Sequence, residues 1–87
     1  MKMKSFEYVI KDELGIHARP AGMLVKEAKK YSSQVCIDNG TKKTDATKLM
    51  AVMGMAVKCG DAVTVTVEGE DEELALEGIR NFFETNL

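Results

Sequence analysis

Two stretches of the chain alternate between apolar and polar residues, and a period of two predicts half-buried β-strands. They span residues 5–11 and 63–68, with inward-facing positions at Phe6, Tyr8, Ile10, Val63, Val65 and Val67. A third strand is predicted over 34–38, where Val35 and Ile37 face inward, and a polar edge strand over 41–45. Asn39-Gly40 between these last two predicts a two-residue hairpin turn with positive φ at both positions.

Three other stretches repeat apolar residues every three or four positions, which predicts amphipathic helices. They span 18 to about 31, 47 to about 57 and 71 to the C-terminus. Their apolar positions are Ala21, Leu24, Val25 and Ala28 in the first, Leu49, Val52, Met53 and Ala56 in the second, and Ala75, Leu76, Ile79, Phe82 and Phe83 in the third. We expect Asp71 to cap the third helix and Gly78 to weaken it slightly.

The predicted order is therefore strand, helix, strand, strand, helix, strand, helix within one domain that spans residues 1–87. Alternation in each strand predicts a sheet with one packed and one solvated face. We expect an α/β fold of the α+β type: a two-layer open-faced sandwich with a four-stranded, mostly antiparallel sheet and three helices on one face.

Charge is distributed unevenly along the chain. Residues 1–58 carry a net charge of +5 and residues 59–87 a net charge of −7, for a total of −2. The basic half predicts a positive face that steers an acidic partner protein, although solvated surface charge explains it equally well. A negative total without aromatic–basic interleaving argues against nucleic-acid binding.

No apolar run has membrane-spanning length and no targeting segment is visible, so we expect a cytoplasmic protein without stable membrane association.

The two cysteines, Cys36 and Cys59, are too few and too far apart for a metal-ligand pattern, so no metal site is predicted. Cys36 lies in an apolar strand pattern, which favours a reduced thiol in the core, and Cys59 lies in a loop before Gly60. A disulfide is not expected in a reducing compartment.

The chemistry is concentrated in Gly15-Ile16-His17-Ala18-Arg19-Pro20-Ala21, which contains the only histidine and the only proline. The unpaired N–H groups of a first helical turn and the helix dipole attract an anion. Arg19 adds a guanidinium shaped for phosphate, and Pro20 suits a helix start. A neutral imidazole at this place is a nucleophile for phosphoryl transfer, with Arg19 and the N–H groups of Ala18 and Arg19 holding the phosphate. A capping or surface histidine is the alternative.

This motif resembles the active-site signature of the HPr family, the phosphocarriers of the bacterial sugar phosphotransferase system. The resemblance runs in register through Val25–Ala28, Asp38–Gly40, Leu49–Met53 and Gly69–Glu72. It implies that His17 accepts a phosphoryl group from enzyme I, itself charged by phosphoenolpyruvate, and passes it to a IIA component. The protein would then be a stoichiometric carrier, rather than a turnover enzyme, and would need no cofactor. We expect a monomer.

The second predicted helix is apolar almost all round, because Met50, Ala51 and Met55 add to its main stripe. Such a helix is either fully enclosed or exposes one edge to partners, a role for which methionine is well suited. We favour the second alternative. By motif position, the resemblance places a docking patch at Leu49, Met50 and Met53, with Lys26 and Lys29 as further partner contacts. Val52 and Met55 would then be core residues.

The chain departs from the family at two positions. Lys48 stands where relatives from low-GC Gram-positive bacteria carry a regulatory serine, and Thr47 is one position away. An ammonium cannot accept phosphate, so we expect kinase regulation at this place to be absent or altered. Leu14 stands where many relatives have a small polar residue that can hydrogen-bond the phosphohistidine.

Three alternatives remain open from sequence. The protein could be a regulatory binding module gated by His17 phosphorylation, or a small-anion binding domain without transfer chemistry. Relatives also serve nitrogen-linked or polyol phosphorelays, so neither the pathway nor the acceptor follows from the residues.

Overall fold

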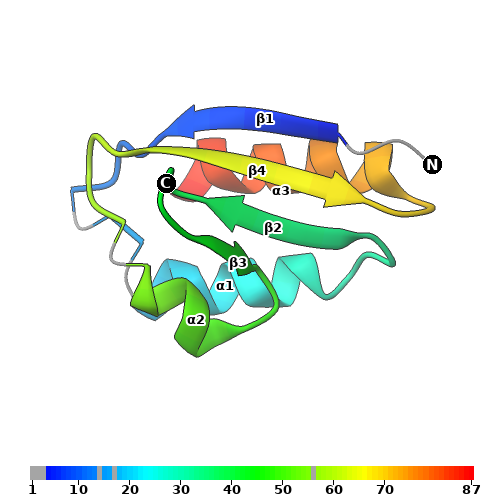
Figure 1. The fold of residues 1–87 in the computed structure, drawn as a ribbon, viewed down its shortest axis with the longest axis horizontal. Coiled ribbons are helices and arrows are strands. Elements are labelled where there is room, and N and C mark those ends of the chain that lie inside the picture. The colour runs from blue at the N-terminus through cyan, green and yellow to red at the C-terminus, as the bar shows by residue number, and fades with distance from the viewer. Residues whose placement is uncertain (1–3, 14, 17, 56) are drawn as a thin grey trace.

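The chain forms a sheet and a helical layer in the predicted element order (Figure 1). The computed structural model describes residues 4–13, 15–16, 18–55 and 57–87. The elements are β1 (Lys4–Val9), α1 (Ala18–Ala28), β2 (Gln34–Asp38), β3 (Lys43–Asp45), α2 (Leu49–Gly54), β4 (Ala62–Glu68) and α3 (Glu72–Asn86).

The four strands form one sheet in the order β1-β4-β2-β3, and every neighbouring pair is antiparallel. Val65 on β4 lies opposite Phe6 on one side and Ile37 on the other. All three side chains are buried on the same face, because alternate residues of a strand point the same way. The open-faced sandwich predicted from the alternation is confirmed.

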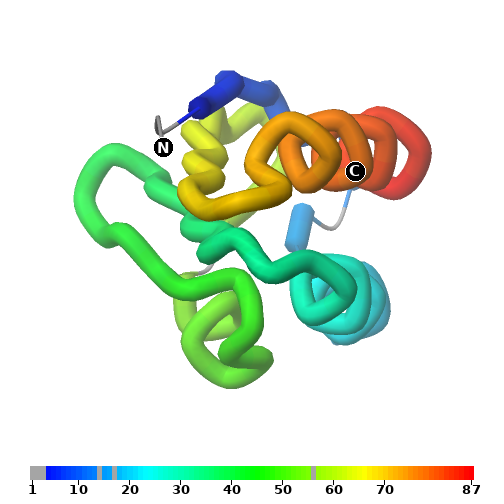
Figure 2. Tube along the Cα trace, turned by 90° about the vertical axis from the view of Figure 1, so that its right-hand side faces the viewer, coloured from blue at the N-terminus to red at the C-terminus, as the bar shows by residue number. Residues whose placement is uncertain are grey.

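The helices enclose the buried face of this sheet. In Figure 2, α1 and α3 lie side by side against it, and α2 lies at the bottom, next to α1 and β3. Val52 and Met55 bring α2 into the same core as the other helices, as predicted. The ring of Phe83 on α3 packs edge-on against Phe6 and Tyr8 at centroid distances of 5.7 and 5.5 Å, a favoured aromatic geometry.

Two helices are shorter than predicted. The first ends at Ala28, not near 31, because its last turn tightens: the N–H groups of Lys30 and Tyr31 donate to carbonyls three residues back. The second spans Leu49–Gly54, not 47–57. Thr47 stays outside it because the Asp45 carboxylate accepts both its backbone N–H and its hydroxyl, at 2.8 and 2.6 Å. Ala56, predicted on its apolar stripe, lies outside the described residues.

The prediction of a two-residue Asn39-Gly40 turn was wrong. Asp38 pairs with Lys43, so the connection has four residues, and β3 begins only at Lys43. Asn39 opens the turn: its N–H donates to the Lys42 carbonyl, and its side-chain oxygen accepts the N–H groups of Thr41 and Lys42. A side chain that satisfies backbone donors in this way stabilises the longer loop.

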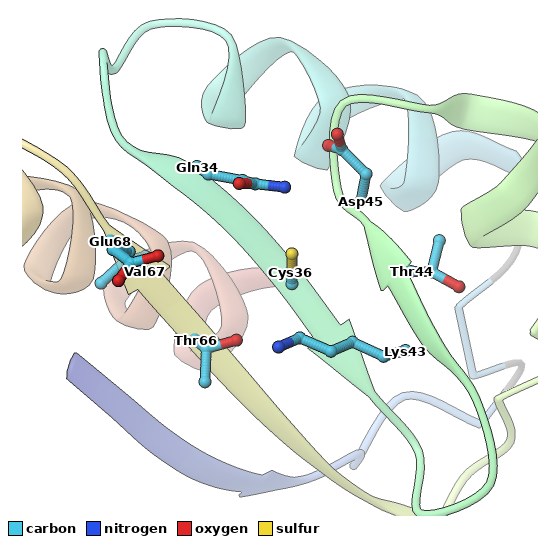
Figure 3. A pocket seen from close by; sticks show the side chains of 8 residues that line it. All are labelled: Gln34, Cys36, Lys43, Thr44, Asp45, Thr66, Val67 and Glu68. Atoms are coloured by element: carbon cyan, nitrogen blue, oxygen red, sulfur yellow. The ribbon is translucent and has the colours of Figure 1, made fainter. Parts of the chain in front are cut away.

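The prediction that Cys36 is a core residue was also wrong. Because Val35 and Ile37 point into the core, Cys36 must point to the open face of the sheet (Figure 3). There it is a half-buried free thiol in a hollow of about 330 Å³, between Lys43 of β3 and Thr66 of β4. Burial is the main cause that raises the pKa of the Cys36 thiol, which makes it a poor nucleophile.

Asp71 occupies the cap position of α3, but its side chain makes no capping hydrogen bond to that helix. Its carboxylate instead accepts the N–H groups of Ser32 and Ser33, at 2.9 and 2.8 Å, and the Ser33 hydroxyl. The predicted cap therefore ties the turn before β2 to the start of α3.

Candidate functional site

The predicted phosphate cradle is the first turn of α1. The helix begins at Ala18, directly after His17 in sequence, and His17 lies outside the described residues. Ala18 and Arg19 are exposed, Pro20 is buried, and this turn carries no acidic residue. The N–H groups of a first helical turn lack partners inside the helix, so an accessible turn lies at the place where an anion was predicted.

Arg19 borders a shallow hollow of about 240 Å³. The hollow is lined by Asp12, Arg19, Pro20, Met23, Thr85 and Asn86. Within the described part of the chain, the side chain of Arg19 makes no ion pair or hydrogen bond, so its guanidinium keeps its donors available for an incoming phosphate. Thr85 and Asn86 could not be predicted from the sequence as part of this hollow, because only the position of the end of α3 brings them there.

The loop that leads into α1 is fixed to two distant parts of the chain. The N–H groups of Lys11 and Asp12 both donate to the main-chain oxygen of Leu87. The N–H of Ile16 donates to the carbonyl of Val57 at 3.0 Å, and Ile16 is buried. The loop that precedes His17 in sequence is thus held by the end of α3 and by the segment that follows α2.

Lys26 and Lys29 are both exposed, as a steering role requires. Lys26 lies in the last turn of α1, eight residues from Ala18, which corresponds to about 12 Å along a helix. Lys29 follows the end of the helix. Both lysines therefore lie too far from the start of α1 to contact a phosphate at Ala18, but close enough to attract an acidic partner.

The predicted docking patch is exposed on α2. The accessible fractions are 40% for Leu49, 79% for Met50 and 37% for Met53. Val52 and Met55 of the same segment are buried, so the helix divides into an inner and an outer apolar face as predicted. Apolar side chains gathered on the exposed side of a short helix are typical of a protein-binding surface.

Lys48 is exposed at the cap position of α2, and its side chain makes no capping hydrogen bond. The neighbouring Thr47 hydroxyl donates to Asp45, and this hydrogen bond is the main cause that lowers the pKa of the Asp45 carboxyl. The position predicted to align with the regulatory serine of relatives therefore carries an ammonium beside a hydroxyl that already has a partner. Leu14, the second departure, lies outside the described residues.

Among the described residues, no group of three histidine, cysteine or acidic side chains is placed to hold a metal ion. In the same part of the chain, none of the helices combines the length and apolar character needed to cross a membrane.

A family model described as the PTS HPr component phosphorylation site matches residues 4–85. The chain is 40% identical to the phosphocarrier protein HPr of Mycoplasma capricolum over 78 residues, which cover 90% of this chain and 88% of the relative. It is 36% identical to the HPr-like protein Crh of Halalkalibacterium halodurans over 75 residues, covering 86% of this chain and 89% of that protein.

Solved structures show the same likeness. A histidine-containing phosphocarrier protein from Mycoplasma superposes with a TM-score of 0.88 at 38% identity, covering 91% of this chain and 90% of the other. Crh of Bacillus subtilis, described as a dimer with a swapped domain, matches with a TM-score of 0.76 at 34% identity and covers 92% of both chains.

Proposed function

The chain belongs to the HPr family of phosphocarriers of the phosphotransferase system, and from this premise we propose that His17 is the residue that carries the phosphoryl group. The donor is the phosphohistidine of enzyme I, charged by phosphoenolpyruvate, and the acceptor is a IIA component. The observation that supports this proposal most directly is the exposed first turn of α1, which begins immediately after His17 and carries Arg19 without an ion pair to another described residue.

The proposed transfer needs only positioning and charge stabilisation from this protein. Nδ1 of the neutral His17 imidazole attacks phosphorus, the P–N bond to the donor histidine breaks, and its electron pair returns to the donor imidazole. The proton on the other ring nitrogen of His17 stays there. Arg19 and the N–H groups of Ala18 and Arg19 stabilise the phosphate oxygens during transfer. Because a phosphohistidine is made and another is consumed, the step is nearly isoenergetic and reversible.

Labelling with radioactive phosphoenolpyruvate and enzyme I tests the assignment. The unchanged protein should gain one acid-labile phosphoryl group, and H17A should gain none. R19A should be labelled more slowly, because it removes charge stabilisation but leaves the nucleophile. Persistent labelling of H17A would disprove the role of His17, and circular dichroism of H17A checks that the variant is folded.

Partner docking in this proposal uses the patch of Leu49, Met50 and Met53, with Lys26 and Lys29 steering acidic partners toward it. Exposure of all five side chains supports this arrangement. The relay would operate in the cytoplasm in sugar uptake, with nitrogen-linked and polyol relays as the alternative pathways. Transfer assays with IIA components of each class distinguish these routes.

We propose that the protein acts as a monomer. β1 pairs with β4 of its own chain over six residues, and the loop that follows β1 is fastened to Leu87. The dimeric Crh structure shows the alternative, and light scattering after gel filtration decides between one chain and two.

A regulatory role is the second candidate, because one structural relative is described as the catabolite repression HPr of Bacillus subtilis. In that case the α2 patch docks a regulator and phosphorylation of His17 only gates it. Capturing partner proteins on the phosphorylated and on the unphosphorylated protein distinguishes the two functions. If the captured partners are regulators and no IIA component becomes labelled, the regulatory role is favoured.

A further inference from the structure

The backbone just before His17 approaches the segment that leaves α2 very closely. These two stretches are neighbours at the left-hand end of Figure 1. The Ile16 N–H donates to the Val57 carbonyl at 3.0 Å, while the Gly15 N–H donates to the Asp12 carbonyl at 2.9 Å. Gly15, Ile16 and Val57 are all buried, so this contact is protected from water.

Position 15 imposes two conditions that only glycine meets together: a positive φ and no room for a side chain. Its φ is +69°, a left-handed backbone that L side chains rarely adopt. A Cβ placed on Gly15 would overlap the Val57 carbonyl oxygen and lie only 2.7 Å from Cα of Lys58. Both obstacles are main-chain atoms, which cannot rotate away as a side chain could.

The segment that holds Ile16 is itself held in place. Asn39 donates from Nδ2 to the Met55 carbonyl at 3.4 Å, and the Lys58 N–H donates to the Asp61 carboxylate at 2.9 Å. The Asp61 carbonyl accepts the N–H of Ile10 at 2.9 Å. The Val57 carbonyl is therefore a fixed acceptor, and a side chain at position 15 would have to displace the loop that leads to His17.

We propose that Gly15 is a positioning residue for phosphoryl transfer: by lacking a side chain it lets the Val57 carbonyl hold Ile16, and thereby sets where His17 stands relative to the first turn of α1. The inference rests on the proposed function of His17. An attacking nitrogen must be aligned with the donor phosphorus, and a displacement of about 1 Å is enough to slow such a reaction about 100-fold.

The same contact joins the two parts of the proposed mechanism. Val57 follows the end of α2 by three residues, and α2 carries the exposed patch of Leu49, Met50 and Met53. A partner that docks on α2 therefore binds the helix that leads directly to Val57, and the Val57 carbonyl holds Ile16, the residue before His17.

Gly60→Ala provides a matched control for Gly15→Ala. Gly60 has a φ of +91°, so alanine meets the same left-handed strain, but nothing lies within 4 Å of the added Cβ. With phospho-enzyme I as donor, G15A should lower kcat by about ten- to a hundred-fold with little change in KM, and G60A should leave both close to the unchanged protein. In the same samples, the NMR signals of the His17 ring should shift in G15A and not in G60A.

A second variant tests the same contact in case G15A fails to fold. Replacing the peptide bond between Gly15 and Ile16 by an ester, through chemical ligation, removes the N–H that donates to the Val57 carbonyl without adding a side chain, and it should lower kcat in the same way. Equal rates for G15A and G60A, a change confined to KM, or an ester variant at full rate would each overturn the positioning role. Those results concern Gly15 alone, whereas failure of the unchanged protein to be labelled, or labelling of H17A, would instead overturn the proposed function.

Discussion

The hydroxyl of Tyr31 lies directly over Gly78, and this contact joins the turn after α1 to the middle of α3. A Cβ on Gly78 would overlap the hydroxyl oxygen and lie 2.8 Å from Cζ of Tyr31. The same hydroxyl donates to Glu27 at 2.9 Å. Burial, followed by this hydrogen bond, raises the pKa of Tyr31, so the phenol stays neutral and keeps its proton for Glu27.

We expect G78A to destabilise the protein by about 1–3 kcal/mol, although alanine is the better helix former, because the added methyl group overpacks the contact. Gly22 in α1 is the matched control: no atom lies within 4 Å of an added Cβ, so G22A should stabilise by up to about 1 kcal/mol. Urea unfolding measures both changes. Equal stabilisation by the two variants would show that the Tyr31 contact does not constrain Gly78.

Much of the fold follows from local pattern. The valines of β4 alternate without exception, so both the strand and its buried face could be predicted from residues 63–68. The exposure of Met50 also followed, because a short helix with apolar residues all round cannot bury every side in a domain of this size. In both cases the information lies within one element.

Two features could not be predicted because they depend on contacts between elements. Asp71 was expected to cap its own helix, but its acceptors reach Ser33, 38 residues away. The Ile16 contact uses the Val57 main-chain carbonyl, which every residue type possesses and which therefore leaves no trace in the sequence. A glycine in the loop before His17 was the one available signal for that contact, since positive φ favours glycine.

Asp71 should make stability depend on pH at the acidic end. The Ser33 hydroxyl, followed by the Ser32 N–H, holds the pKa of this carboxyl below its ordinary value of 3.8. A lowered pKa means that the ionised form stabilises the fold fully above pH 4, and that this contribution is lost as pH falls through the lower, folded-state value.

D71A should therefore lower Tm at pH 7, and its difference from the unchanged protein should shrink steadily below pH 4. Glu70 is an exposed neighbour that makes no hydrogen bond to another described residue, so E70A should show little difference at any pH. Thermal unfolding followed by circular dichroism between pH 2 and pH 7 gives these curves. A Tm difference for D71A that is constant with pH would contradict the role of the charge.

The patch on α2 predicts a selective effect on partner binding. M50A should raise KM for phosphorylation by enzyme I about three- to tenfold, because it removes an exposed apolar contact worth about 1 kcal/mol, and should leave Tm unchanged. Leu74 on α3 is the control, since it is 64% exposed and far from the patch in sequence. If L74A raised KM as much as M50A did, docking would not be specific to α2.

Position 48 predicts resistance to the ATP-dependent kinase that modifies the regulatory serine of low-GC Gram-positive relatives. Lys48 offers no hydroxyl, and the Thr47 hydroxyl donates to Asp45 at 2.6 Å, which orients it toward its own chain. Intact-mass analysis after incubation with this kinase and ATP should show no added phosphate on the unchanged protein. K48S should accept one phosphate, which would prove that the kinase is active and docks on α2. A phosphate on Thr47 of the unchanged protein would refute the prediction and show that the Asp45 hydrogen bond opens readily in the kinase complex.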